Sequence, residues 1–195
     1  MIERAEIQET FAELLGMIQD KALAEKVVDV WMMGIAEGGW ESMAQLQKAP
    51  FTLVTETRGL NLIEHTIAVT KGAIGLATGQ TETYDNPPYE IDMDRLVAGG
   101  LLHDVGKLLE IQLKEDGSAV RSHNGYCARH PISGAILAGK CGLSDELINT
   151  IACHASEGDG RPQVVETVLI HQADFASFNP LVMMTKNALI GYLDC

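Results

Sequence analysis

Apolar residues recur three and four positions apart along most of this chain, and this spacing is the strongest constraint on its fold. Such spacing places the apolar side chains on one face of an α-helix. In the first fifty residues it predicts two helices that end near the EGGW segment at 37–40. Further helices are predicted at 59–79 with Asn61 as the cap, from about Asp92 through the leucine-rich segment that follows, and at 130–141, 144–155, 162–177 and 181–193.

Two segments interrupt the helical pattern. Residues 81–92 contain the proline and asparagine typical of a loop, and Asp116-Gly117 lies between two short mixed runs, which indicates a hairpin turn. The chain has 195 residues, enough for one domain of ordinary size with a substantial core. We therefore expect an all-α bundle with at most one small β-hairpin.

Composition and charge narrow the class of protein. A formal net charge of −13 disfavours a broad electrostatic hold on nucleic acid or on an anionic membrane, because both are polyanions. No stretch approaches the roughly 18 consecutive apolar residues of a membrane helix, and the acidic N-terminus is unlike a signal peptide. The cysteines, at positions 127, 141, 153 and 195, lie far apart. We expect reduced thiols and a cytoplasmic protein.

The segment GGLLHDVGKLLE, residues 99–110, carries His103 and Asp104 inside a run that is mostly apolar. Burying unpaired polar groups costs several kcal/mol. These two side chains are therefore either paired with each other or occupied by a ligand.

Five of the six histidines fall within predicted helices or at their ends, and a second carboxylate, Asp174, follows one of them by three positions. Neutral imidazole together with carboxylate suits Fe, Mn, Co, Ni or Zn rather than Ca. A single histidine on an apolar helix is more often a core residue than a ligand, and a bare His-Asp pair is a weak signal. Several helices each bring a histidine into apolar surroundings, and this pattern by itself leaves a metal site and core packing equally open. The five histidines are His65, His103, His130, His154 and His171.

From residue 59 to about 177 the chain resembles the HD superfamily of metal-dependent phosphohydrolases. The resemblance lies in the order H…HD…H…H…D. Within the superfamily, the chain is similar to the HD domain of bacterial 3′-5′ exoribonucleases and to HD proteins with two metals. The matching segments are LIEHTIAV, GGLLHDVGKLLE, RHPISGAILA, IACHASEGDGRP and VLIHQADFAS. Residues 1–50 carry no part of this match, so we expect a helical extension packed on an HD domain at 51–195.

The resemblance implies a set of metal ligands. Four positions match the ligands shared by the superfamily: His65, His103, Asp104 and Asp174. His130 and His154 match the two additional histidines of members with a dinuclear centre, in which Asp104 bridges one ion to the other. Ala155 and the GRP segment at 160–162 depart from the HD-GYP branch, which argues against cyclic-dinucleotide hydrolysis of that type.

The resemblance also implies a function: hydrolysis of a phosphate ester by water that one or two divalent transition-metal ions activate. Asp104 and Lys107 are the expected catalytic residues. Lys107, one helical turn after His103, and Arg161 are expected to contact the substrate phosphate, and His171 is expected to orient a ligand.

The expected substrate is a nucleotide or another small phosphorylated metabolite; RNA is a less favoured one. Two alternatives stay open: a di-iron oxygenase acting on a phosphonate or polyol, because the six-ligand set resembles that branch, and a non-catalytic signalling module. A homodimer through the N-terminal helices that carry Trp31 and Trp40 is a further expectation.

Overall fold

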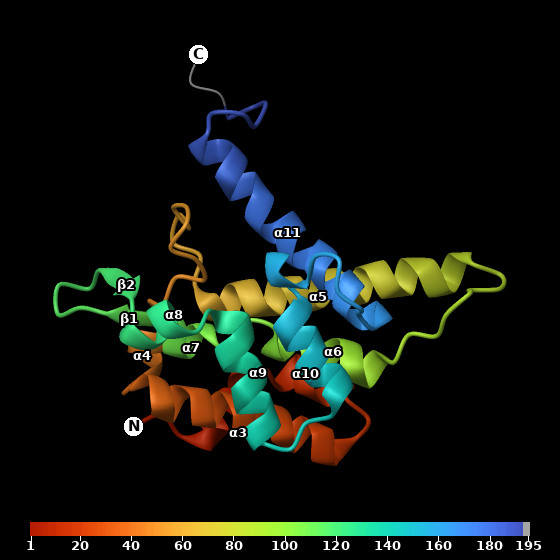
Figure 1. Ribbon diagram of the computed structural model, residues 1–195, viewed down its shortest axis with the longest axis horizontal. Coiled ribbons are helices and arrows are strands. Elements are labelled where there is room, and N and C mark those ends of the chain that lie inside the picture. Colours follow the sequence, from red (N-terminus) through yellow and green to blue (C-terminus); the bar gives the residue numbers. More distant parts are fainter. Residues whose placement is uncertain (193–195) are drawn as a thin grey trace.

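The computed structural model describes residues 1–192 and consists of helices with one small antiparallel hairpin in that range (Figure 1). The all-α prediction and the hairpin at Asp116-Gly117 are therefore confirmed. In chain order the elements are α1 (Arg4–Thr10), α2 (Ala12–Met17), α3 (Lys21–Gly38), α4 (Met43–Leu46), α5 (Leu62–Thr83), α6 (Met93–Leu102), α7 (Lys107–Glu110), β1 (Ile111–Leu113), β2 (Ala119–Arg121), α8 (His123–Cys127), α9 (His130–Lys140), α10 (Asp145–Cys153), the 3-10 turn η1 (Ser156–Gly158) and α11 (Val165–Thr185).

Capping residues set where the central helices begin. Asn61 caps α5, as predicted: its side chain accepts a hydrogen bond from the amide of Glu64, and the Glu64 carboxylate accepts one from the amide of Asn61. This reciprocal pair satisfies two amides that the first turn leaves free. Asp92 and Ser144 cap α6 and α10 with one bond each: their side chains accept from the amides of Arg95 and Leu147. These caps fix the register of the helices that carry His65, His103 and His154.

The single helix predicted from Asp92 through the leucine-rich segment is wrong. Helix α6 ends at Leu102, residues 103–106 form a turn, and α7 starts at Lys107. The turn has the tighter three-residue hydrogen bonds, from the amide of Val105 to the carbonyl of Leu102 and from Lys107 to Asp104. Apolar spacing continues across the turn, so the pattern could not reveal the break.

Helix α11 also differs from the prediction, which separated 162–177 from 181–193. One helix runs through Pro180 to Thr185. Its far end rises from the body of the molecule (Figure 1). Pro180 and Ala176 are exposed, so water can bond to the Ala176 carbonyl that the missing proline N–H leaves free. Residue 193, the end of the second predicted helix, lies outside the described residues, as does Cys195. Cys127, Cys141 and Cys153 are free thiols.

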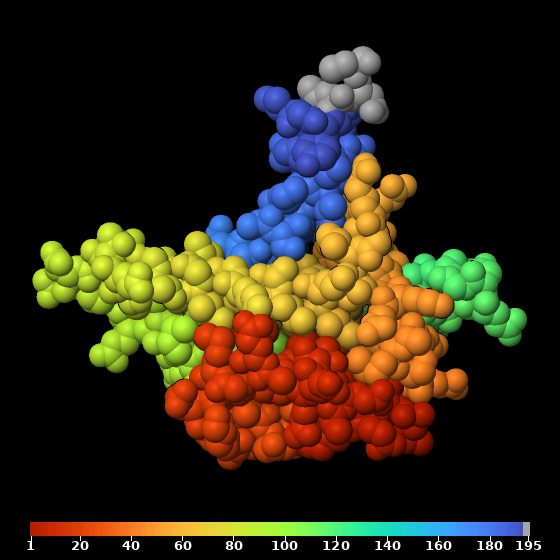
Figure 2. Space-filling model, turned by 180° about the vertical axis from the view of Figure 1, so that it is seen from behind, coloured from red at the N-terminus to blue at the C-terminus, as the bar shows by residue number. Residues whose placement is uncertain are grey.

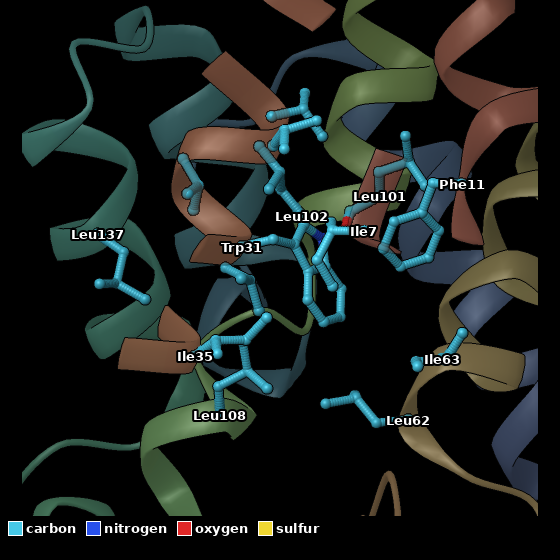
Figure 3. Packing of buried hydrophobic residues seen from close by; sticks show 14 of the residues in the cluster. Ile7, Phe11, Trp31, Ile35, Leu62, Ile63, Leu101, Leu102, Leu108 and Leu137 are labelled. Carbon is cyan, nitrogen blue, oxygen red and sulfur yellow. The ribbon is translucent and has the colours of Figure 1, made fainter. Parts of the chain in front are cut away.

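The N-terminal helices form the base of the molecule in Figure 2. Trp31 lies at the centre of the buried cluster that joins α3 to α6 and α7 (Figure 3). Its indole N–H donates to the carbonyl oxygen of Leu101 at 2.9 Å, and that of Trp40 donates to Leu108 at 2.8 Å. Both tryptophans are therefore fixed to the segments that flank the turn at 103–106.

This packing removes the two tryptophan side chains from the expected dimer surface. Trp31 is fully buried and Trp40 is 5% exposed, so neither presents a ring to a second molecule. One hydrophobic cluster extends from the N-terminal helices to α9 and α11. The division at residue 50 and the homodimer itself stay predictions. Within residues 1–192, no helix combines the length and the apolar character needed to cross a membrane.

Candidate metal centre

Six side chains from distant parts of the chain converge at the centre of the molecule. His65 lies in the first turns of α5, His103 and Asp104 in the turn after α6, and His130 at the start of α9. His154 directly follows α10, and Asp174 lies on α11. We call this group the histidine–aspartate cluster: His65, His103, Asp104, His130, His154 and Asp174. All six predicted ligands are in it.

Asp104 occupies the middle of the cluster and faces a different pair of imidazoles with each carboxylate oxygen. Its Oδ1 lies 3.3 Å from Nε2 of His130 and 3.4 Å from Nε2 of His154. Its Oδ2 lies 3.2 Å from Nε2 of His65 and 3.5 Å from Nε2 of His103. The result is two groups of three buried donor atoms that share Asp104.

The far side of each imidazole is held by a hydrogen bond that turns Nε2 toward Asp104. Nδ1 of His103 donates to the carbonyl oxygen of Gly100 at 2.7 Å, and Nδ1 of His154 donates to Ile151 at 2.8 Å. Carbonyl oxygens only accept hydrogen bonds, so these rings carry their proton on Nδ1 and present a lone pair at Nε2. This is the tautomer that binds metals through Nε2.

The remaining two imidazoles are held by side chains. Nδ1 of His130 donates to Oε2 of Glu110 at 2.8 Å, and Nδ1 of His65 lies 3.2 Å from Oγ of Ser177. Phe51 stacks on the ring of His65, with the ring centroids 4.0 Å apart. All four rings are thus fixed in orientation from outside the cluster.

The interior of the cluster fits a cation. The Nε2 lone pairs of His103 and His154 face oxygens of Asp104, and two acceptors cannot form a hydrogen bond. Oδ1 of Asp104 and Nε2 of His154 are buried and have no hydrogen-bond partner in the part of the chain that the structure describes. Such groups cost free energy when unsatisfied, and a positive ion between them removes that cost.

The charge states of the cluster also suit metal ligands. Burial works to raise the pKa of Asp104, but Lys107 and the neighbouring imidazoles outweigh it and hold that pKa well below its usual range. Burial and the charge of Lys107 lower the pKa of His130 to about 4, so this ring is neutral near pH 7. Burial opposes but does not prevent the drop in the pKa of Asp174 to about 2, which its hydrogen bond with His65 produces.

His65 is the exception, because its pKa is raised. Burial lowers it, but hydrogen bonds with Asp104 and Asp174 have the larger combined effect. Its Nε2 lies 3.2 Å from the first carboxylate and 3.1 Å from the second. A position between two carboxylates attracts positive charge, whether that charge is a proton or a metal ion.

Residues 62–177 match the HD domain family. The chain belongs to this family. The match covers the whole histidine–aspartate cluster, from His65 to Asp174, and confirms the resemblance seen in the sequence. No solved structure matches the chain.

Curated relatives of this HD domain protein include two kinds of phosphate-ester enzyme. The chain is 30% identical over 176 residues to a dihydroneopterin 2′,3′-cyclic phosphate phosphodiesterase from Methanocaldococcus jannaschii, covering 86% of this chain and 68% of the relative. It is 34% identical over 119 residues to ribonuclease Y from Pseudothermotoga lettingae and 32% identical over 119 residues to ribonuclease Y from Thermotoga maritima. These two matches cover 61% of this chain but only 19% of each ribonuclease. The predicted class, a metal-dependent hydrolase of phosphate esters, is confirmed.

The other predicted site residues of the HD domain lie at different distances from the cluster. Lys107 is adjacent to it: its Nζ lies 2.6 Å from Oδ2 of Asp104. It is not one helical turn from His103, because the turn at 103–106 intervenes. Arg161 is exposed, and within residues 1–192 no hydrogen bond or ion pair joins its side chain to the cluster.

His171 lies behind the cluster rather than in it. Its Nδ1 donates to the carbonyl oxygen of His154 at 2.7 Å, and its ring stacks on Phe175. It therefore contacts the backbone of a predicted ligand, and its orienting role stays a prediction. The sixth histidine, His123, is the first residue of α8 and is exposed.

Sequence reasoning missed the residues that orient the imidazoles. Glu110 is the clearest case, because it is buried and binds both the ring and the backbone amide of His130. A signal was present: a glutamate ends the leucine-rich segment, where a buried charge needs a partner. Ser177 and Phe51 offered no comparable signal.

Proposed function

We propose that this chain is a phosphodiesterase that opens a small cyclic phosphate ester, and that the histidine–aspartate cluster holds two divalent transition-metal ions. The central position of Asp104, with each oxygen facing two imidazole Nε2 atoms at 3.2–3.5 Å, carries this proposal. His65, His103 and Asp174 would hold one ion, His130 and His154 would hold the other, and Asp104 would bridge them.

Ions bound at these residues would lower the pKa of water to near neutrality and offset negative charge on a phosphoryl oxygen. The chain itself supplies orientation and charge. Asp104 and Asp174 stay ionised near pH 7, and His130 stays neutral, so these three groups need no proton release before they bind a cation.

Lys107 is the cation of the chain that is best placed to bind the substrate. Its side chain is 11% exposed, and its ammonium group contacts Oδ2 of Asp104. The same ammonium lies over the ring of Phe51, 5.7 Å from the ring centroid. An ammonium held between the cluster and the surface can donate to a phosphate oxygen while its stem stays packed.

Two observations support the proposed substrate class: the name of the phosphodiesterase relative and the net charge of this chain. The phosphodiesterase relative acts, by its name, on a small cyclic phosphate, and the match covers most of both chains. The net charge of −13 repels long polyanions such as RNA. A small molecule with one phosphodiester therefore suits this chain better than the substrate of the ribonuclease relatives.

The test uses protein stripped of metal and reloaded with Mn²⁺, Fe²⁺, Co²⁺, Ni²⁺ or Zn²⁺. The substrates are dihydroneopterin 2′,3′-cyclic phosphate, 2′,3′-cyclic mononucleotides and linear phosphate monoesters. We expect at least one cyclic ester to be opened to a monoester. Elemental analysis of the freshly purified protein identifies the ion and its stoichiometry.

Asp104→Asn should abolish this activity and the binding of both ions, because the shared carboxylate is lost while the side-chain volume is kept. Asp85→Asn, at an exposed loop position, is the matched control and should retain both. The proposal would be overturned if the wild-type protein hydrolysed none of the esters with any of the metals. Oxygen consumption by the Fe²⁺-loaded protein would instead identify an oxygenase.

A further inference from the structure

We infer that Glu110 is a positioning residue that decides whether the second ion, at His130 and His154, is held. The inference rests on the proposed two-ion centre and concerns a residue outside the histidine–aspartate cluster. Glu110 acts through His130: one carboxylate oxygen, Oε2, accepts hydrogen bonds from the amide of His130 at 2.7 Å and from its Nδ1 at 2.8 Å.

The two ion positions are unequal in negative charge. The group around His65 has two carboxylates within hydrogen-bond distance of that ring, Asp104 and Asp174. The group around His130 has only the shared Asp104. Among the described residues, Glu110 is the one carboxylate that contacts the far side of a cluster imidazole, and it contacts this group. It supplies through His130 the charge that Asp174 supplies to the other group.

Carboxylate support of this kind makes the imidazole a stronger ligand. A carboxylate on Nδ1 fixes the tautomer, holds the ring plane and raises the basicity of Nε2, and loss of such a partner weakens metal binding roughly 10–100-fold. Gly100, Ile151 and Ser177 offer only neutral oxygens to the other three rings. The effect of removing Glu110 is therefore specific to one ion.

The surrounding fold holds Glu110 in place. The backbone carbonyl of Glu110 accepts from the amide of Ser122 at 2.8 Å, where the hairpin returns. A Cβ atom at Gly125 would lie 2.8 Å from Cγ of Glu110, so α8 packs directly against the side chain. Arg121 lies 3.7 Å from Oε1 and leaves Oε2 to His130. The hairpin and α8 thus pack around this carboxylate and hold it in position.

Glu110 also caps α9, and the experiment must separate this structural role from the positioning role. Glu110→Gln keeps an oxygen that can accept both hydrogen bonds but removes the charge. Glu110→Ala removes both. Glu115→Gln removes the same charge from the exposed turn of the hairpin and is the matched control.

The measurement is the titration of metal-free protein with Co²⁺, followed by visible absorption and by competition with a chelator. A nitrogen-15 spectrum of the metal-free protein reports the tautomer of His130. Wild type and Glu115→Gln should bind two ions and show His130 protonated on Nδ1. Glu110→Gln should keep the first ion and bind the second about 10–100-fold more weakly. Glu110→Ala should not bind the second ion, and its His130 should no longer be held in a single tautomer.

Two ions bound to Glu110→Gln with wild-type affinity would overturn this inference, even if Glu110→Ala failed to fold, because the cap alone would then explain the contact. Wild-type protein that binds one ion or none would overturn the two-ion centre itself. The two failures are distinguished by the wild-type titration.

Discussion

Substitution of Lys107 can test substrate binding separately from metal binding. Its ammonium group contacts Asp104 but contributes no atom to either group of donor atoms. Replacing Lys107 with Met keeps the length of the side chain and removes the charge. A charge-assisted hydrogen bond to a phosphate is worth about 1.5–3 kcal/mol, so KM should rise at least about tenfold.

Steady-state kinetics of Lys107→Met with the best cyclic ester check this expectation, and metal content should remain at the wild-type level. Lys114→Met, on the exposed turn of the hairpin, is the control and should leave KM unchanged. An unchanged KM in Lys107→Met would show that the ammonium only balances the charge of Asp104.

The residues of the cluster were accessible from the sequence, but their partners were not. Four histidines and two aspartates in a recognisable order predicted a group that the structure brings together. The hydrogen bonds on Nδ1 follow no single spacing along the chain. Those of His103 and His154 go to carbonyls three residues earlier, whereas His130 needs Glu110, twenty residues away. The long-range partners depend on packing, which spacing does not encode.

At the scale of elements, the contact between the turn at 103–106 and α9 is tight enough to require glycine. A Cβ atom at Gly106 would lie 2.0 Å from the carbonyl oxygen of His130 and 2.6 Å from the amide nitrogen of Gly134. Backbone atoms cannot move aside as the end of a side chain can. Gly106→Ala should therefore lower the free energy of unfolding by about 1–3 kcal/mol or more.

Thermal unfolding of metal-free protein by circular dichroism measures this loss without a contribution from bound ions. The control is Gly79→Ala, in the exposed outer part of α5, where no atom lies within 4 Å of the new Cβ. This change should stabilise the protein by roughly 0.5–1 kcal/mol, because alanine is the better helix former. Equal melting temperatures for the two variants would contradict the close approach.

The elements show where the helical pattern is informative. Spacing and caps located α5, α9 and α10 closely, because each begins at a recognisable polar residue or proline. The break between α6 and α7 was missed because Leu102 and Val105 are both fully buried, so apolar spacing continues through a turn. The continuous α11 was missed because a proline ordinarily marks a helix end.

At the scale of the whole molecule, bound ions should add directly to stability. The predicted ligands belong to five helices or their ends, and none of these groupings exists in the unfolded chain. A ligand that binds only the folded state at one hundred times its dissociation constant stabilises that state by about 2.7 kcal/mol. Thermal unfolding with Co²⁺ and with excess chelator should differ accordingly.

Asp104→Asn is the control for this measurement, because its melting temperature should not depend on Co²⁺. Superimposable wild-type curves with and without the ion would contradict a centre shared by these helices. The chelator curve also gives the intrinsic stability of the helical bundle. In that state the facing lone pairs around Asp104 are unsatisfied.

The position of Asp174 late in the chain has a consequence for biosynthesis. The other five predicted ligands lie between residues 65 and 154, and the α11 segment that completes them is made afterwards. All six side chains can therefore come together only after α11 has left the ribosome and packed along α5.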